Sequence, residues 1–135
     1  MNLFATKNTL LLATLLMALS ATAQAQTERS AAYIACMDNA EDSPYRNAEW
    51  NSCIAAELAV QDSVLNAEYQ TLRVSLSAEQ KSALLQGQKA WLTYHESWCR
   101  FTEQGNSAPG GAINYSLCML DLTDKQIELI KAEQP

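Results

Sequence analysis

The stretch EWNSCIAAELAVQDSVLNAEYQTLRVSL (Glu49–Leu76) has the clearest helical periodicity of the chain, and no Gly or Pro interrupts it. Large side chains recur there every three or four residues, the spacing of one face of an α-helix. This stretch therefore predicts a long amphipathic helix with one buried face. The members of that face are Ile54, Leu58, Gln61, Leu65, Tyr69, Leu72 and Leu76.

Further helices are expected on both sides of this stretch. The pattern Ser77-Ala78-Glu79-Gln80 is a capping box and predicts a helix that runs to about Phe101. A shorter helix is expected from Tyr33 to about Asn39, and a last helical region starts near Ile113. A second capping-box pattern begins at Thr123, which allows this last helix to break or restart there. No segment alternates with the period of a strand for more than a few residues, so the predicted fold class is all-α with about four helices.

Gly and Pro mark two connections between the expected helices. The first is AEDSPYRN (Ala40–Asn47), and the second is EQGNSAPGGA (Glu103–Ala112). Gly110-Gly111 reads as a turn signal beside Pro109, not as a phosphate-binding loop. We expect both connections to be exposed, where binding residues commonly lie.

Four cysteines predict two disulfides in a small exported chain. Three connectivities are possible, and the spacing favours Cys36–Cys53 and Cys99–Cys118. Each of these would close a loop of about 20 residues and contribute roughly 3 kcal/mol. Zinc binding is the alternative, but no C-x-x-C pair is present and the chain has one histidine. The prediction is a small helical bundle stapled by two disulfides.

The first 25 residues have the pattern of a signal peptide. Lys7 precedes an apolar run from Leu10 to Leu19, and small residues follow, with cleavage expected after Ala23 or Ala25. The run is shorter than the roughly 20 residues of a membrane span, and no cysteine follows it closely, so neither an uncleaved anchor nor a lipid anchor is favoured. We expect residues 26–135 to form a single soluble domain in the periplasm or outside the cell.

The charge of the chain excludes one class of partner. From Thr27 onward, eight Lys and Arg stand against fifteen Asp and Glu, which leaves a net charge of −7. Nucleic acid is a poor partner for such a surface, because phosphate binding needs positive charge. A cationic protein would be attracted to it, although acidity also serves simply to keep an exported protein soluble.

The stretch QKAWLTYHESWC (Gln88–Cys99) is the strongest candidate for chemistry, and its helical spacing argues against catalysis. Trp91, His95 and Trp98 share the apolar face, which predicts core tryptophans and a hydrogen-bonded core histidine. Ser97 and Glu96 point around the helix, so His95 lacks the nucleophile and orienting group of a catalytic site. We expect no enzymatic activity, no cofactor and no metal ion.

Two sets of carboxylates give no better evidence of a site. Glu57 and Asp62 lie five residues apart on a helix and diverge by about 140°, too far to act on one substrate together. Asp38, Glu41 and Asp42 lie in or beside the first connection, where a solvated acidic loop is a simpler interpretation than a cation site.

Several spaced motifs together resemble the LprI-type lysozyme-inhibitor-like family over roughly Tyr33 to Ile130. They are the four cysteines, the motif D-x-x-LN-x-x-Y, the motif Q-x-x-WL-x-Y, and Thr123 with Ile127. The residues that carry the two motifs are Asp62, Leu65, Asn66 and Tyr69, then Gln88, Trp91, Leu92 and Tyr94.

The resemblance implies a small exported helical protein of the bacterial envelope, in which the motifs are a structural signature. At least one lipoprotein member inhibits lysozyme, and related domains are proposed as immunity or stress proteins. This chain departs from the pattern at three points. It lacks the lipobox cysteine, His95-Glu96 replaces a basic residue and Asp, and Gln126 replaces the usual Arg. Any charged contact that family members share at the last two positions is therefore in doubt here.

The leading functional hypothesis is a binding protein that inhibits a cationic, lysozyme-type cell-wall hydrolase through its two connections. The alternatives are an immunity or partner protein for a secreted effector, and a structural envelope-stress protein. The residues expected to bind the partner are Glu41, Asp42, Tyr45 and Arg46 of the first connection, and Glu103 and Asn106 of the second.

Overall fold

The computed structural model describes residues 28–105 and 110–135, which form four α-helices. They are α1 (Ala31–Ala40), α2 (Arg46–Val74), α3 (Ala78–Gln104) and α4 (Gly110–Ala132). Within these described ranges there is no β-strand. The prediction of an all-α fold with about four helices is confirmed. The predicted signal peptide, residues 1–25, lies outside the described residues.

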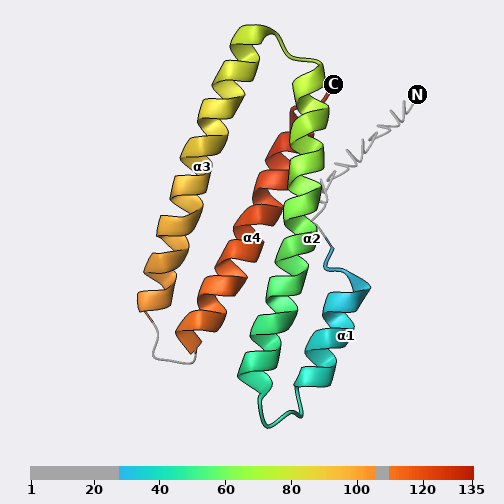
Figure 1. The fold of residues 1–135 in the computed structure, drawn as a ribbon, viewed down its shortest axis with the longest axis vertical. Helices are drawn as coiled ribbons and strands as arrows, with labels where there is room; N and C mark the ends of the chain where they lie inside the picture. Colours follow the sequence, from blue (N-terminus) through green and yellow to red (C-terminus); the bar gives the residue numbers. More distant parts are fainter. Residues whose placement is uncertain (1–27, 106–109) are drawn as a thin grey trace, which may run out of the picture.

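Helix α4 is the centre of the arrangement (Figure 1). It packs against both α2 and α3, and α1 packs against α2; these are the three extensive helix–helix interfaces. Although α2 and α3 follow each other through a short turn, they diverge instead of packing along their length. The α1–α2 connection and the C-terminal end of α3 lie at one end of the bundle, which we call the loop end.

Side-chain caps explain where two of the helices begin. Ser77 Oγ accepts a hydrogen bond from Gln80 N at 3.3 Å, and Gln80 Oε1 accepts one from Ser77 N at 2.9 Å. The predicted capping box of α3 is therefore confirmed. At the start of α1, Ser30 Oγ accepts from Tyr33 N at 3.0 Å. Both caps satisfy backbone N–H groups that a helix leaves without partners.

The prediction of a break or restart at Thr123 is wrong, because α4 is continuous through this residue. Thr123 is fully buried, and its hydroxyl donates to the Met119 carbonyl one turn earlier, at 2.9 Å. A threonine bonded in this way is compatible with a helix interior. Leu120 and Ile127, fully buried on either side, have helical spacing across Thr123, and their burial favours continuation.

Gly110-Gly111 was expected to form a turn, and this expectation is also wrong. The two glycines are the first residues of α4, and Gly111 is buried. Pro109 lies outside the described residues. The composition of this segment is typical of a turn, but the adjacent helix can extend into it.

The hydrophobic core lies along the α2–α4 interface. Leu65 and Leu72 of α2 pack with Ile127 and Ile130 of α4. Burial of each such side chain contributes about 1.5–3 kcal/mol. Partly buried neighbours from α2, α3 and the turn between them complete the cluster: Val64, Tyr69, Leu76, Leu84 and Trp91.

Two disulfides join neighbouring helices, and the predicted pairing is confirmed. Cys36–Cys53 links α1 to α2 with a Cα–Cα distance of 5.8 Å. Cys99–Cys118 links α3 to α4 with a Cα–Cα distance of 5.5 Å. Each helix pair is therefore tied covalently near the loop end.

Trp98 is not a core residue, contrary to the prediction from its helical spacing. It remains 45% exposed and lies between the exposed rings of Tyr94 and Phe101, with ring centroids at 6.0 and 5.5 Å. The side of α3 that faces α4 buries His95 and Cys99 instead. A helix with a single packing partner can bury only a narrow stripe, and Trp98 lies beyond that stripe.

Candidate functional site

The first connection presents its predicted binding residues at the loop end of the bundle. Glu41, Asp42, Tyr45 and Arg46 are all exposed, and Tyr45 is 73% exposed although it is aromatic. Arg46 Nη1 lies 3.6 Å from Glu41 Oε1, and its guanidinium also covers the ring of Trp50 at 5.0 Å. The structure therefore brings these four residues together on one short, exposed segment.

This connection is held firmly although it is exposed. The Cys36–Cys53 bridge joins the helices on either side of it. Within it, Ser43 Oγ accepts from Tyr45 N at 3.1 Å and donates to Glu49 Oε1 at 2.7 Å. A loop with fixed ends and internal hydrogen bonds loses little conformational entropy when it binds a partner.

The second connection contributes less to this surface than the sequence suggested. Glu103 is in the last turn of α3, and its Oε2 accepts from Arg100 Nη1 at 3.2 Å. Arg100 Nε also donates to Glu96 at 2.8 Å, and Tyr115 OH donates to the same carboxylate at 2.6 Å. These bonds, that of Tyr115 first, lower the pKa of Glu96. Asn106 lies outside the described residues.

The residues of the two sequence motifs line a groove between α2 and α3, which has a volume of about 580 Å³. The resemblance implies that these residues are a structural signature; Leu65 among them is buried, whereas Asp62, Asn66 and Leu92 are exposed. Tyr94 does not line the groove. The motif residues in the groove are Asp62, Leu65, Asn66 and Tyr69 from α2, and Gln88, Trp91 and Leu92 from α3; His95 and Met119 adjoin them.

His95 is a buried, hydrogen-bonded residue, as predicted. Its Nε2 lies 2.8 Å from the Met119 carbonyl oxygen. A carbonyl can only accept, so Nε2 carries the proton and donates. The imidazole also stacks on Trp91. These contacts position the ring as a link between α3 and α4.

Asp62 lies on the groove wall opposite α3 and has an altered acidity. Partial burial among the groove residues raises the pKa of its carboxyl, and the nearby His95 opposes this effect. Its carboxylate is therefore incompletely hydrated although the residue as a whole is exposed. An incompletely hydrated acceptor gains more from a hydrogen bond with a ligand than a fully solvated one does.

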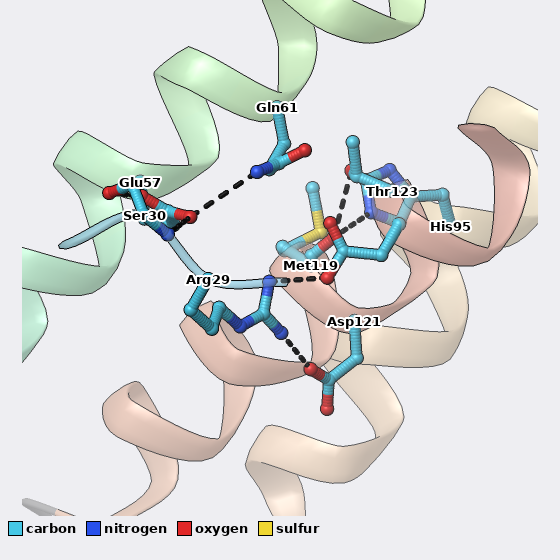
Figure 2. A network of polar contacts seen from close by, with 9 residues as sticks. Arg29, Ser30, Glu57, Gln61, His95, Met119, Asp121 and Thr123 are labelled. Carbon is cyan, nitrogen blue, oxygen red and sulfur yellow. Dashed lines mark hydrogen bonds and ion pairs between the residues drawn. The ribbon is translucent and has the colours of Figure 1, made fainter. Parts of the chain in front are cut away.

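A buried polar network inside the bundle was not predicted from the sequence (Figure 2). Ser30 donates to Glu57 twice, from its backbone N at 2.9 Å and from Oγ at 2.5 Å, and Gln61 Nε2 donates to the same carboxylate at 3.2 Å. Burial alone would raise the pKa of Glu57, but these bonds and the charge of Arg29 outweigh it and lower the pKa. Glu57 is therefore an ionised, well-satisfied carboxylate in the interior.

Arg29 connects this network to α4. Its Nη2 lies 2.6 Å from Asp121 Oδ1, and its Nη1 donates to Asp124. Burial raises the pKa of Asp124, and the Arg29 charge opposes this. The segment before α1 is thus bonded to both α2 and α4.

Part of this network had a signal in the sequence. Gln61 stands on the otherwise apolar stripe of α2, and Glu57 precedes it by one helical turn, so their polar atoms had to find buried partners. Nothing in the sequence pattern indicated that Ser30, before the first helix, would donate to Glu57, or that Arg29 would pair with Asp121 and Asp124 of α4. The network holds the bundle together, and two of its members, Ser30 and Glu57, also line a pocket of about 270 Å³ between α1 and α2.

The described residues contain no group of three His, Cys, Asp or Glu side chains able to hold a metal ion. In the same residues, no helix is long and apolar enough to cross a membrane.

The family model described as "Lysozyme inhibitor LprI" matches residues 36–129, which is most of the chain. The chain belongs to the LprI family. No curated protein and no solved structure matches it. The matched region of this LprI-family chain includes both disulfides, both connections and all residues of the groove. Arg29 and Ser30 precede it, so these two contributors to the buried network lie outside the part that matches the family.

Proposed function

We propose that this LprI-family protein is an exported binding protein without catalytic activity, and that it inhibits a lysozyme-type cell-wall hydrolase in the periplasm or outside the cell. Membership of a lysozyme-inhibitor family supports the type of partner. The two disulfides and the signal-peptide pattern support export. The net charge of −7 from Thr27 onward favours a cationic hydrolase.

The observation that carries this proposal is the firmly held, acidic first connection. It presents the exposed phenol of Tyr45 next to Glu41 and Asp42. An aromatic anchor surrounded by charges is typical of an interface centre. In the proposed complex the first connection enters the hydrolase cleft. The Glu41 and Asp42 carboxylates then occupy the sites of the sugar substrate or of the catalytic carboxylates.

The two acids are not equivalent in this proposal. Glu41 is partly neutralised by Arg46 at 3.6 Å. Asp42 has no ion-pair or hydrogen-bond partner among the described side chains, so its charge is available to a partner. Asp42 is therefore expected to contribute more to long-range attraction, and Tyr45 more to the stability of the formed complex.

A lysis assay on bacterial cell walls with the purified, oxidised chain tests the proposal. We expect near-stoichiometric inhibition of lysozyme that weakens as salt increases. Asp42→Lys should slow association on the order of tenfold at low salt and reduce the salt dependence. Glu133→Lys makes the same change in net charge directly after the C-terminal end of α4, which lies away from the loop end, and is the matched control.

Two results would contradict the proposal. An absence of inhibition at large excess would reject lysozyme as the client. Inhibition that Asp42→Lys and Tyr45→Ala leave unchanged would reject the first connection as the binding surface.

A further inference from the structure

The groove between α2 and α3 exists because these two helices pack on α4 and not on each other. Met119 of α4 lies at its floor, and the walls belong to α2 and α3. Its volume of about 580 Å³ is within the range of roughly 300–1,000 Å³ that is usual for small-molecule sites. The binding surface proposed above is on a separate segment at the loop end, so the groove has no role in that proposal.

The apolar part of the groove is incompletely buried. Tyr69 and Trp91 offer aromatic surface on opposite walls. Leu92 is 52% exposed, and Leu85 is similarly open. One side of Trp91 is covered by His95, and its remaining surface contributes to the groove. Exposed apolar side chains gathered in a concave site indicate a ligand with an apolar face.

The polar part of the groove has free hydrogen-bonding capacity. Asp62 and Asn66 are one turn apart on α2, and Lys89 faces them from α3. None of these three side chains has a hydrogen-bond or ion-pair partner among the described residues. Gln88 is different, because its Oε1 accepts from Gln126 Nε2 at 3.0 Å, which leaves only its amide N–H groups for a ligand.

These features exclude two kinds of ligand. A wholly apolar chain such as a lipid tail would bury Asp62 and Asn66 without partners, which costs several kcal/mol. A polyanion would meet one carboxylate and one ammonium and would gain no net electrostatic attraction. What remains is an uncharged ligand with one apolar face and an edge rich in hydroxyl or amide groups.

We infer that the groove binds a saccharide of the N-acetylhexosamine type, as a short segment of a glycan. The apolar C–H face of a pyranose ring packs on aromatic side chains, for which Tyr69 and Trp91 are available. Its hydroxyl and acetamido groups pair with planar carboxylate and amide side chains, here Asp62, Asn66 and Gln88. The acetamido methyl group fits the open leucine surface. No hydrolase takes part in this binding, so the inference goes beyond the proposed function.

The three tryptophans of the chain make the inference directly testable. Trp50 lies under the first connection, Trp91 in the groove and Trp98 on the outer face of α3. Their indole N–H signals in a ¹H–¹⁵N spectrum, assigned by single Trp→Phe variants, report on three separate surfaces. The oxidised chain is titrated with a soluble N-acetylglucosamine tetramer and, in parallel, with an uncharged peptide of similar size.

Saturable movement of the Trp91 signal with the sugar, and not of the Trp50 or Trp98 signals, is the expected result. Asn66→Ala and Asp62→Ala should each weaken binding roughly tenfold, the effect of losing a hydrogen bond worth about 1.4 kcal/mol. Gln86→Ala removes an exposed amide from α3 outside the groove and should leave binding unchanged.

Other results would overturn the inference. They are no movement of the Trp91 signal at the highest sugar concentration, movement with the peptide but not the sugar, or equal weakening by Gln86→Ala. The titration contains no hydrolase, so its failure is independent of the lysis assay. If the protein inhibits lysozyme but does not bind the sugar, the inference about the groove is rejected and the proposed function is not.

Discussion

The indole of Trp91 stacks on the imidazole of His95, with ring centroids 4.5 Å apart and planes inclined by 17°. The stack joins the groove to the core, because Trp91 also packs against the core cluster and His95 donates to the Met119 carbonyl of α4. Trp98, seven residues further along the same helix, has only exposed aromatic neighbours. The two tryptophans of the stretch Gln88–Cys99 thus have different roles.

The first prediction follows from this difference. Trp91→Ala should lower the free energy of unfolding by about 3 kcal/mol, because a large core-packing side chain is lost. Trp98→Ala should lower it by less than about 1 kcal/mol. Urea unfolding followed by far-UV circular dichroism measures both without relying on tryptophan emission. Equal losses would contradict the exposed position of Trp98.

Gly87 is a site where a substitution should stabilise the protein. It lies within α3, and a Cβ added there would meet no atom within 4 Å. Gly87→Ala should therefore raise the free energy of unfolding by about 0.5–1 kcal/mol, since alanine favours the helix. Gly105→Ala, at the end of the same helix, is the control and should change it less. A loss of stability in Gly87→Ala would show a contact that the structure does not contain.

The Cys36–Cys53 bridge should slow hydrogen exchange mainly in α1 and the connection that follows it. Among the described helices, α1 packs extensively only on α2, and the bridge joins these two. Replacing both cysteines by serine should cost about 3 kcal/mol in the chain-entropy account. Hydrogen exchange should then accelerate chiefly in residues 31–45, while α3 and α4 keep their protection.

The matched variant replaces Cys99 and Cys118 by serine. That bridge joins α3 to the central helix, so its loss should accelerate exchange across the whole bundle. Uniform acceleration in both variants would mean that α1 is not a separate unit.

Glu57 should make stability depend on pH. Its pKa is lowered from the ordinary 4.5, so its stabilising contribution is complete above that value and is lost as pH falls through the folded-state pKa. Glu57→Gln should cost about 1–3 kcal/mol at neutral pH, because the amide cannot accept both hydrogen bonds from Ser30.

The measurement is the difference in unfolding free energy between the two proteins from pH 7 to pH 3. This difference should shrink below about pH 4.5. Asp124, whose pKa is raised, changes the profile of both proteins in the opposite direction, so the difference and not the wild-type curve is diagnostic. A constant difference would show that folding does not change the pKa of Glu57.

The helices, the capping box at Ser77 and both disulfides could be predicted because local chemistry determines them. The Ser77–Gln80 bonds depend only on adjacent residues, and the cysteine pairs are close in sequence. The prediction of a helix break at Thr123 was wrong because a local capping signal competes with tertiary burial. Burial of the stripe through Leu120 and Ile127 outweighed that signal.

The groove could not be predicted because it depends on how far two helices diverge. Helical spacing correctly places Trp91 and His95 on one face, but it cannot show that α3 lacks a second packing partner. For the same reason it placed Trp98 in the core. The role of Arg29 needed the three-dimensional path of the segment before α1.

The central position of α4 determines when the bundle can form. Protein synthesis proceeds from the N-terminus, so the helix that joins α2 and α3 is made after both of them. Cys36 and Cys53 can pair as soon as both reach an oxidising compartment, whereas Cys99 must wait for Cys118. Until residues 110–132 emerge, the apolar faces of α2 and α3 have nothing to cover them and are open to proteases and to aggregation. A chain truncated before residue 110 would therefore lack the helix that joins α2 to α3.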